Sequence, residues 1–170
     1  KKLSAEPPRK VHWPLQFIST SQLNPDKGHK DVLYAFHKLK KEGYNFHYHV
    51  VGTGKIEKDL KSLAQELGLS DRITWHGFQK DVRKFLKKAD VFILASYSEG
   101  LPNSLLEAMA EGLIPIARDV GGVKEVWPDE IQQFLISYMS RAKDFEKFIK
   151  KLLKIPDYEL LQIKKIGRAS

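Results

Sequence analysis

Short apolar runs alternate with helix-period segments along most of this chain, and no other sequence feature restricts the fold as strongly. The apolar runs lie at residues 15–20, 46–51, 73–76, 91–95, 114–117 and 134–136. The helix-period segments lie at residues 30–41, 56–67, 81–88, 101–111, 141–153 and 158–166. The runs are too short for helices, and such alternation is typical of repeated strand and helix units with parallel strands. We therefore predict an α/β domain with a Rossmann-like, doubly wound parallel sheet.

The domain organisation follows from length and from the first residues. A chain of 170 residues suits one ordinary domain with a sizeable core. Residues 1–14 are rich in proline and charge, which predicts a linker or N-terminal extension before a single domain over residues 15–170. The chain opens without methionine and stops directly after helical sequence that has no terminating signal. We expect it to be a piece of a longer protein.

Charge and cysteine usage narrow the class of protein. The formal net charge of +8 implies attraction to an anion such as phosphate, nucleic acid or a lipid surface. The lysines are spread over several predicted helices, so solvated helix faces are the favoured explanation and a membrane-facing patch is the alternative. The chain has no cysteine and no apolar run near the roughly 18 residues that span a bilayer. We expect a cytoplasmic protein, with peripheral contact to the cytoplasmic face of the membrane as an option.

The strongest candidate site follows the apolar run at residues 91–95. Glu99 lies in the loop after it, Pro102 suits the first position of the next helix, and Glu107 falls on the second helical turn. Amides at the start of a helix have no intrahelical acceptor, so this helix start predicts an anion site that suits a diphosphate. The amides concerned are those near Leu101, Asn103 and Ser104.

Two carboxylates of this segment suit the recognition of a sugar nucleotide. Asn103 and Glu107 are four residues apart and therefore share one face of the predicted helix. A carboxylate such as Glu107 can accept hydrogen bonds from vicinal ribose hydroxyls, and Glu99 at the mouth would face the sugar. The alternative is that both are solvent-exposed helix acids.

Residues 98–109 (SEGLPNSLLEAM) resemble the signature of glycosyltransferase family 4, in which two glutamates are separated by seven residues. Other segments are similar to the C-terminal domain of that family in the same order. They are residues 26–28 (DKG), 51–54 (VGTG), 76–78 (HGF), 88–91 (KADV) and 119–126 (DVGGVKEV). The resemblance covers roughly residues 15–127. The glutamate spacing alone is a weak signal, whereas several ordered matches in one alternating fold are specific.

The resemblance implies one half of a GT-B enzyme, which has two facing Rossmann-like domains. This chain would be the half that binds the donor, a nucleoside-diphosphate sugar with UDP favoured, and the N-terminal acceptor-binding domain would be absent. Members of the family retain anomeric configuration and need no catalytic metal. The sequence agrees, because it contains no Asp-x-Asp element that would chelate a diphosphate-bound cation. No cofactor is expected, and the acceptor would be a glycan or a lipid-linked sugar.

The resemblance also implies roles for single residues. Lys27 would contact the donor diphosphate and Glu99 the transferred sugar, so these two are the predicted catalytic residues, with Glu107 on the ribose. Gly28 would let the backbone approach the ligand closely, although a plain loop lysine is the alternative for Lys27. The remaining predicted binding residues are Gly77 and Phe78 at the base pocket and Gly100, Leu101, Asn103 and Ser104 at the helix start.

One departure from the family pattern concerns the predicted diphosphate site. The family commonly has an arginine five residues before the lysine, whereas this chain has Gln22 there. A glutamine donates hydrogen bonds but lacks both the charge and the forked geometry that grips phosphate. Diphosphate binding is therefore expected to be weaker than in relatives, and catalysis is placed in doubt.

Other functions remain as alternatives or are disfavoured. A sugar-nucleotide epimerase of the same fold and a catalytically silent nucleotide-binding or nucleic-acid-binding module are the alternatives, with nucleic acid not expected as a partner. His47 and His49 alternate on one strand face, but no third metal ligand lies near them in sequence. The residues 52–54 lack the third glycine of a dinucleotide fingerprint. Ser98 and Ser104 have no histidine nearby that would act as a base.

Overall fold

The computed structural model describes residues 10–169, with side chains as far as residue 166. Within these residues six strands form one sheet in the order β3-β2-β1-β4-β5-β6, and its pairings are parallel. The strands are β1 (Leu15–Thr20), β2 (Phe46–Val51), β3 (Ile73–Gly77), β4 (Val91–Leu94), β5 (Ile114–Arg118) and β6 (Leu135–Ile136). The strand order reverses between β1 and β4, as in a doubly wound fold. The predicted Rossmann-like architecture is confirmed.

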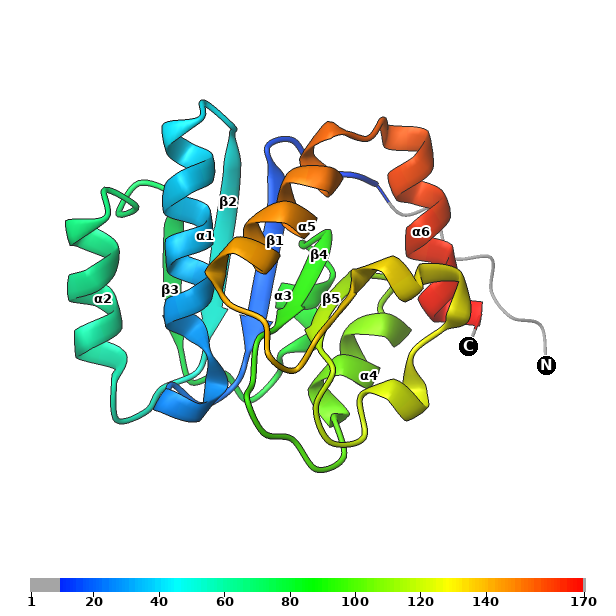
Figure 1. The fold of residues 1–170 in the computed structure, drawn as a ribbon, viewed down its shortest axis with the longest axis horizontal. Coiled ribbons are helices and arrows are strands. Elements are labelled where there is room, and N and C mark those ends of the chain that lie inside the picture. The colour runs from blue at the N-terminus through cyan, green and yellow to red at the C-terminus, as the bar shows by residue number, and fades with distance from the viewer. Residues whose placement is uncertain (1–9, 170) are drawn as a thin grey trace.

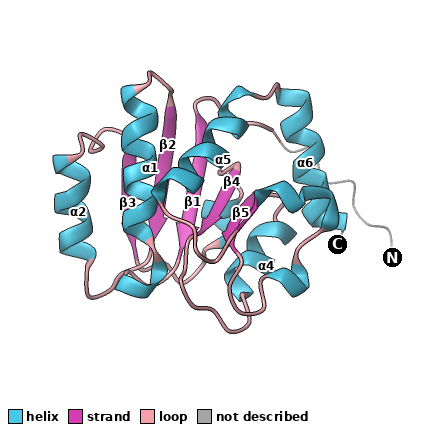
Figure 2. Cartoon of the chain, in the orientation of Figure 1, coloured by secondary structure: helices cyan, strands magenta, loops and turns pink. Residues whose placement is uncertain are grey.

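Helices cover both faces of the sheet (Figure 1). They are α1 (His29–Lys41), α2 (Glu57–Glu66), α3 (Arg83–Leu86), α4 (Asn103–Ala110), α5 (Ala142–Lys154) and α6 (Asp157–Ala169). Three short 3-10 helices, η1 (Pro25–Lys27), η2 (Lys124–Val126) and η3 (Asp129–Phe134), lie in the connections. Helices α1 and α5 pack side by side on the face toward the viewer, and α3 lies behind the sheet (Figures 1 and 2). No helix within residues 10–169 is long and apolar enough to cross a membrane.

The central strands are buried because they have helices on both sides. Every residue of β4 and β5 is buried. Toward β2 the core is aromatic, with the rings of Phe36 and Phe46 stacked at 4.6 Å and Phe36 meeting Phe17 edge to face at 5.2 Å. The strands that carry the candidate site are therefore held rigidly by tight packing on both faces.

Two helices differ from the sequence prediction. The segment at residues 81–88 forms only the short helix α3, and α4 begins at Asn103, two residues later than expected. Pro102 precedes α4 as its N-cap, because its φ of −81° and ψ of 68° are not helical. The sequence predicted Pro102 as the first helical residue, and this prediction is wrong by one position.

A buried charge cluster closes the amino-terminal edge of the sheet. Asp90, which is fully buried just before β4, accepts hydrogen bonds from the ammonium of Lys164 at 2.7 Å and from the Gln16 amide at 2.8 Å. The His12 amide donates to the same carboxylate at 3.0 Å. Asp90 therefore fastens α6 and the segment before β1 to the sheet, at the edge opposite to the candidate site.

Candidate functional site

The loops after β1, β4 and β5 meet at the carboxyl edge of the sheet, where ligands bind in doubly wound folds. The Tyr97 amide donates to the Asp26 carbonyl at 2.8 Å, which joins the loop after β4 to the loop after β1. The Gly122 amide donates to the Gly100 carbonyl at 3.1 Å, which joins the loops after β5 and β4. The three loops thus form one connected surface.

Glycine is required where two of these loops touch. Gly28 has a φ of 71°, and a Cβ there would lie 1.9 Å from the carbonyl oxygen of Ala95. Gly121 has a φ of 53°, and its Cβ would lie 1.7 Å from the carbonyl oxygen of Glu99. The sequence analysis had explained Gly28 by the approach of a ligand, but the neighbour that the structure places against it is the backbone of Ala95. Gly28 therefore has a packing role that sequence could not reveal.

The two predicted catalytic side chains lie together although they are 72 residues apart in sequence. The Lys27 ammonium is 3.4 Å from the Glu99 carboxylate and 3.9 Å from that of Asp26. The side chains of Lys27 and Glu99 are 21% and 14% exposed, so the pair is largely shielded from water. An anionic ligand beside Lys27 would compete with Glu99 for its charge.

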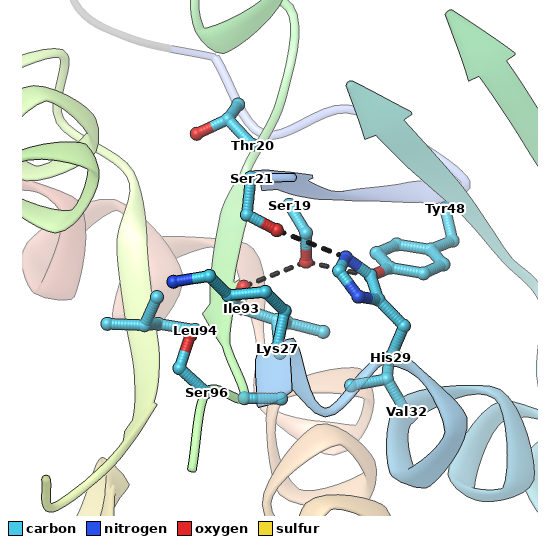
Figure 3. A pocket seen from close by; sticks show the side chains of 11 residues that line it. Ser19, Thr20, Ser21, Lys27, His29, Val32, Tyr48, Ile93, Leu94 and Ser96 are labelled. Atoms are coloured by element: carbon cyan, nitrogen blue, oxygen red, sulfur yellow. Dashed lines mark hydrogen bonds between the residues drawn. The ribbon is translucent and has the colours of Figure 1, made fainter. Parts of the chain in front are cut away.

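Lys27 lines a small polar cavity of about 10 Å³ (Figure 3). The Tyr48 hydroxyl donates to the Ser19 hydroxyl at 2.7 Å, and Ser19 donates to the Ile93 carbonyl at 2.8 Å. Such a volume corresponds to about one water-sized sphere. The cavity beside the Lys27 side chain therefore has no room for a sugar or a base.

His29 also lines this small cavity and is buried (Figure 3). Its Nε2 is 3.2 Å from the Ser21 hydroxyl, whereas its Nδ1 and the hydroxyl of Ser96 have no hydrogen-bond partner among residues 10–169. Burial, and secondarily the charge of Lys27, lower the pKa of His29 to about 4. The imidazole is therefore neutral at pH 7, and Lys27 is the cation of this part of the site.

A second, larger cavity opens beside the first and has a volume of about 450 Å³. This size lies within the range of small-molecule sites. It shares Thr20 and Ser21 with the small cavity, and a neighbouring hollow of about 460 Å³ shares Lys80, Val82 and Glu107 with it. The lining residues of the larger cavity are Thr20, Ser21, Gln22, Val51, Gly52, Thr53, Phe78, Gln79, Lys80, Val82 and Glu107. The structure thus brings together Gln22, Phe78 and Glu107, three of the predicted binding residues.

Other predicted binding residues have different surroundings. The Asn103 amide donates to the Leu101 carbonyl at 2.9 Å, so it is not the free amide that the sequence analysis expected at the helix start. The side chains of Leu101 and Asn103 are exposed, and Ser104 is half-buried. Gly77 does not appear among the residues that line the cavity, and its carbonyl accepts the Gly52 amide at 2.8 Å.

Sequence analysis missed Arg118, which ends β5 and is fully buried. Its guanidinium lies 3.0 Å from the Asp31 carboxylate and donates to the Ala95 carbonyl at 3.2 Å. The sequence did offer a signal, because Arg118 directly follows the apolar residues 114–117 of a predicted strand. An arginine at the end of a buried strand needs an acidic or polar partner if it is buried too. Lys80 was also missed as a cavity residue, because it was grouped with the scattered surface lysines.

The pair of strand histidines acquires a third neighbour in the structure. His49 Nδ1 lies 2.9 Å from His76 Nε2 on β3, and His47 Nε2 lies 2.7 Å from the hydroxyl of Thr74. Even so, no group of three or more His, Asp or Glu side chains arranged to hold a metal ion occurs within residues 10–169. These histidines are hydrogen-bonded to protein neighbours.

Comparison with known proteins extends these observations. The family described as "Glycosyl transferases group 1" matches residues 4–169. The amylovoran biosynthesis glycosyltransferase AmsK of Erwinia amylovora is 32% identical over 133 residues, which is 74% of this chain and 33% of that protein. The chain therefore spans about a third of the length of this curated relative.

Solved structures share the fold at lower identity. The C-terminal domain of LpcC, a glycosyl transferase group 1 family protein from Francisella tularensis, has a TM-score of 0.78 and 23% identity over 91% of this chain and 83% of that one. Anabaena Alr3699/HepE in complex with UDP and glucose has a TM-score of 0.76 and 20% identity over 91% of this chain and 42% of that one. The chain belongs to the glycosyl transferases group 1 family, and its fold is that of the C-terminal half of a GT-B glycosyltransferase.

Proposed function

We propose that this chain is the donor-binding domain of a retaining glycosyltransferase that uses a UDP-sugar. With an N-terminal domain it would transfer the sugar to a glycan or lipid-linked acceptor. The observation that carries the proposal is the shielded Lys27–Glu99 pair next to a cavity of about 450 Å³ that Glu107 lines. Family membership supports the reaction class, and the complex of HepE with UDP and glucose supports the choice of UDP.

The larger cavity suits the nucleoside of the donor. Phe78 is 76% exposed at its rim, so its ring is free to contact a base, and aromatic rings favour stacked contacts. The carboxylate of Glu107, on the first turns of α4, would accept hydrogen bonds from the two ribose hydroxyls. Thr20 and Ser21 line both cavities, so a ligand in the larger one would extend toward Lys27.

The Lys27–Glu99 pair suits the reacting end of the donor. In the free chain each side chain is the counter-ion of the other, at 3.4 Å. A diphosphate beside Lys27 would become the new counter-ion, and Glu99 would then accept hydrogen bonds from hydroxyls of the sugar. This exchange would give Lys27 a new counter-ion and would give the Glu99 carboxylate hydrogen-bond donors, so neither charge would be left without a polar partner in a shielded site.

Transfer with retention would follow from this arrangement. The bond between the anomeric carbon and the diphosphate oxygen would break while the acceptor hydroxyl attacks from the same face, and the hydroxyl proton would pass to the departing diphosphate oxygen. Negative charge grows on the departing diphosphate, and the Lys27 ammonium stabilises it there. Glu99 would hold the sugar in position, and the acceptor would be bound by the partner domain.

Gln22 supports a catalytically silent module as the second candidate. The Asn24 amide donates to the Gln22 side-chain oxygen at 3.0 Å, and Gln22 lines the larger cavity without supplying charge. A silent module would bind nucleotide with its partner domain present and still transfer nothing. Binding to nucleic acid would instead collapse as salt is raised, because it depends on phosphate neutralisation.

The test is calorimetric titration of this chain with UDP, GDP and a panel of their sugar conjugates. We expect binding of UDP and of at least one UDP-sugar, with no transfer by this chain alone, because the acceptor half of the cleft is absent. Failure of both UDP and GDP to bind would contradict the proposal. Measurable transfer by this chain alone would contradict the need for a partner domain.

A further inference from the structure

Arg118 is the largest fully buried side chain of the described residues, and its guanidinium contacts three separate segments. Nη2 lies 3.0 Å from the carboxylate of Asp31 on α1, and Nε donates to the carbonyl of Ala95 after β4 at 3.2 Å. Nη1 donates to the Ser140 carbonyl in the loop before α5. A planar fork with several donors satisfies these separate acceptors at once.

Two aromatic rings enclose the same guanidinium. The ring of Tyr97 lies 4.2 Å and that of Phe145 lies 5.0 Å from its central carbon, distances at which cation–π attraction operates. The Tyr97 hydroxyl donates to the Asp31 carboxylate, which therefore pairs with both Arg118 and Tyr97. The loop after β4 is thus attached to α1 by side chains, and to η1 by the hydrogen bond between the Tyr97 amide and the Asp26 carbonyl.

Arg118 connects the two segments that carry the Lys27–Glu99 pair. Asp31, in the first turn of α1, stands four residues after Lys27, and Tyr97 stands two residues before Glu99. The hydrogen-bond and ring contacts of Arg118 within the described residues are with Ala95, Ser140, Asp31, Tyr97 and Phe145, so its influence on Lys27 and Glu99 must pass through the backbone of these segments. A shift of about 1 Å in a positioned group is enough to impair function strongly.

We propose that Arg118 is a positioning residue that sets the separation of Lys27 and Glu99 and thereby the affinity for the donor diphosphate. It acts without touching the donor. The inference rests on the proposed function of the site, in which Lys27 meets the diphosphate. The nucleoside half, around Phe78 and Glu107, lies on other segments and does not depend on Arg118.

The test uses Arg118→Lys, which keeps a cation beside Asp31 but loses the fork that reaches Ala95 and Ser140. We expect UDP affinity to fall roughly tenfold, as for loss of a hydrogen bond to a charged group, and uridine affinity to stay within about twofold. Tyr97→Phe removes only one hydroxyl from the network and should act in the same direction with a smaller effect, roughly threefold. It keeps the proposal testable if Arg118→Lys fails to fold.

The matched control is Lys164→Met, which removes the buried cation beside Asp90 at the opposite edge of the sheet. It should lower the urea midpoint and leave the ratio of UDP to uridine affinity unchanged. A merely structural role for Arg118 would give the same unchanged ratio in Arg118→Lys, and that result would overturn the inference.

Hydrogen exchange gives a readout that needs no nucleotide. The amides of Tyr97 and Gly122 join the three site loops, and they should exchange at least about tenfold faster in Arg118→Lys than in the wild type. The Gly52 amide should exchange at the wild-type rate in Arg118→Lys. In the Lys164→Met control, the Tyr97 and Gly122 amides should exchange at the wild-type rate. If the wild type binds neither UDP nor GDP, the proposed function fails, and exchange still decides the role of Arg118. Unchanged exchange at Tyr97 and Gly122 in Arg118→Lys would overturn the inference.

Discussion

The two halves of the candidate site are built differently. We call the set Lys27, Asp31, Glu99 and Arg118 the paired half, because its charges are matched within the protein at 3.0 and 3.4 Å. We call the set Gln22, Phe78, Lys80 and Glu107 the open half. These four side chains are exposed around the cavity of about 450 Å³.

The two halves therefore differ in what a ligand gains by binding to them. In the paired half the protein already supplies a partner for each charge, so a ligand must replace an existing interaction and gains mainly from correct placement. In the open half the side chains face water, so a ligand adds contacts that the free protein lacks. We therefore expect substitutions of Phe78 and Glu107 in the open half to change nucleoside binding, and substitutions in the paired half to change stability or diphosphate binding.

The largest expected effect on binding comes from the open half. Glu107→Ala should weaken both uridine and UDP by about 1.5–3 kcal/mol, because both ligands would lose charge-assisted hydrogen bonds to ribose. Calorimetry with the two ligands measures the loss. Glu66→Ala, an exposed glutamate at the end of α2, is the control and should change neither affinity. Unchanged uridine binding in Glu107→Ala would remove Glu107 from the nucleoside site.

A pH effect should come from His29, which lines the small cavity next to the paired half. The folded pKa of His29 is lowered from 6.5 to about 4, chiefly by burial. The unfolded chain therefore binds a proton that the native chain does not, so stability falls as pH drops below 6.5 and continues to fall toward 4. Between pH 7 and 5 this contribution is about 2 kcal/mol, and His29→Gln should remove it from the urea unfolding curves.

A control for this pH effect is available outside the site. The pKa of His49 is also lowered to about 4, by burial first and then by His47 and His76. His49→Gln should therefore also reduce the pH dependence of the free energy of unfolding. His29→Gln should leave the contribution of His49 to that pH dependence unchanged. If His29→Gln keeps the full wild-type slope between pH 7 and 5, His29 does not stay neutral in the folded chain.

The boundary between the halves should respond to an added cation. Gln22→Arg introduces a forked hydrogen-bond donor near the proposed diphosphate site and should tighten UDP binding by about 1 kcal/mol. This gain should shrink as salt is raised. Lys27→Ala should act in the opposite direction, and both variants should leave uridine binding nearly unchanged. Loss of UDP binding in Lys27→Ala without any effect of Gln22→Arg would show that Gln22 does not align with the phosphate site.

The smallest effect is expected at Lys80. It is exposed on the rim that Glu107 shares, where solvent screens its charge. Lys80→Ala should weaken UDP by no more than about 0.5 kcal/mol, measured in the same titrations. If Lys80→Ala weakened UDP binding as much as Lys27→Ala does, the exposed Lys80 and the shielded Lys27 would contribute equally, which would contradict the comparison.

The sequence by itself determined the fold class, and it supplied most of the residues that we propose for the site. Period-2 and period-3.6 patterns are local, so the strands were predicted within a residue or two, and a motif such as residues 98–109 is contiguous. The same local patterns were least accurate at ends, as for α3 and the start of α4, because helix ends depend on competing hydrogen bonds such as that of the Asn103 amide.

The tertiary structure alone decided which residues meet across the sheet. The contact between Lys27 and Glu99 joins positions 72 apart, and that between Asp31 and Arg118 joins positions 87 apart. Neither is encoded in any local pattern, because it depends on the strand order that brings the ends of β1, β4 and β5 to one edge. For the same reason the close approach of Gly28 to the backbone of Ala95 could not be predicted from the sequence.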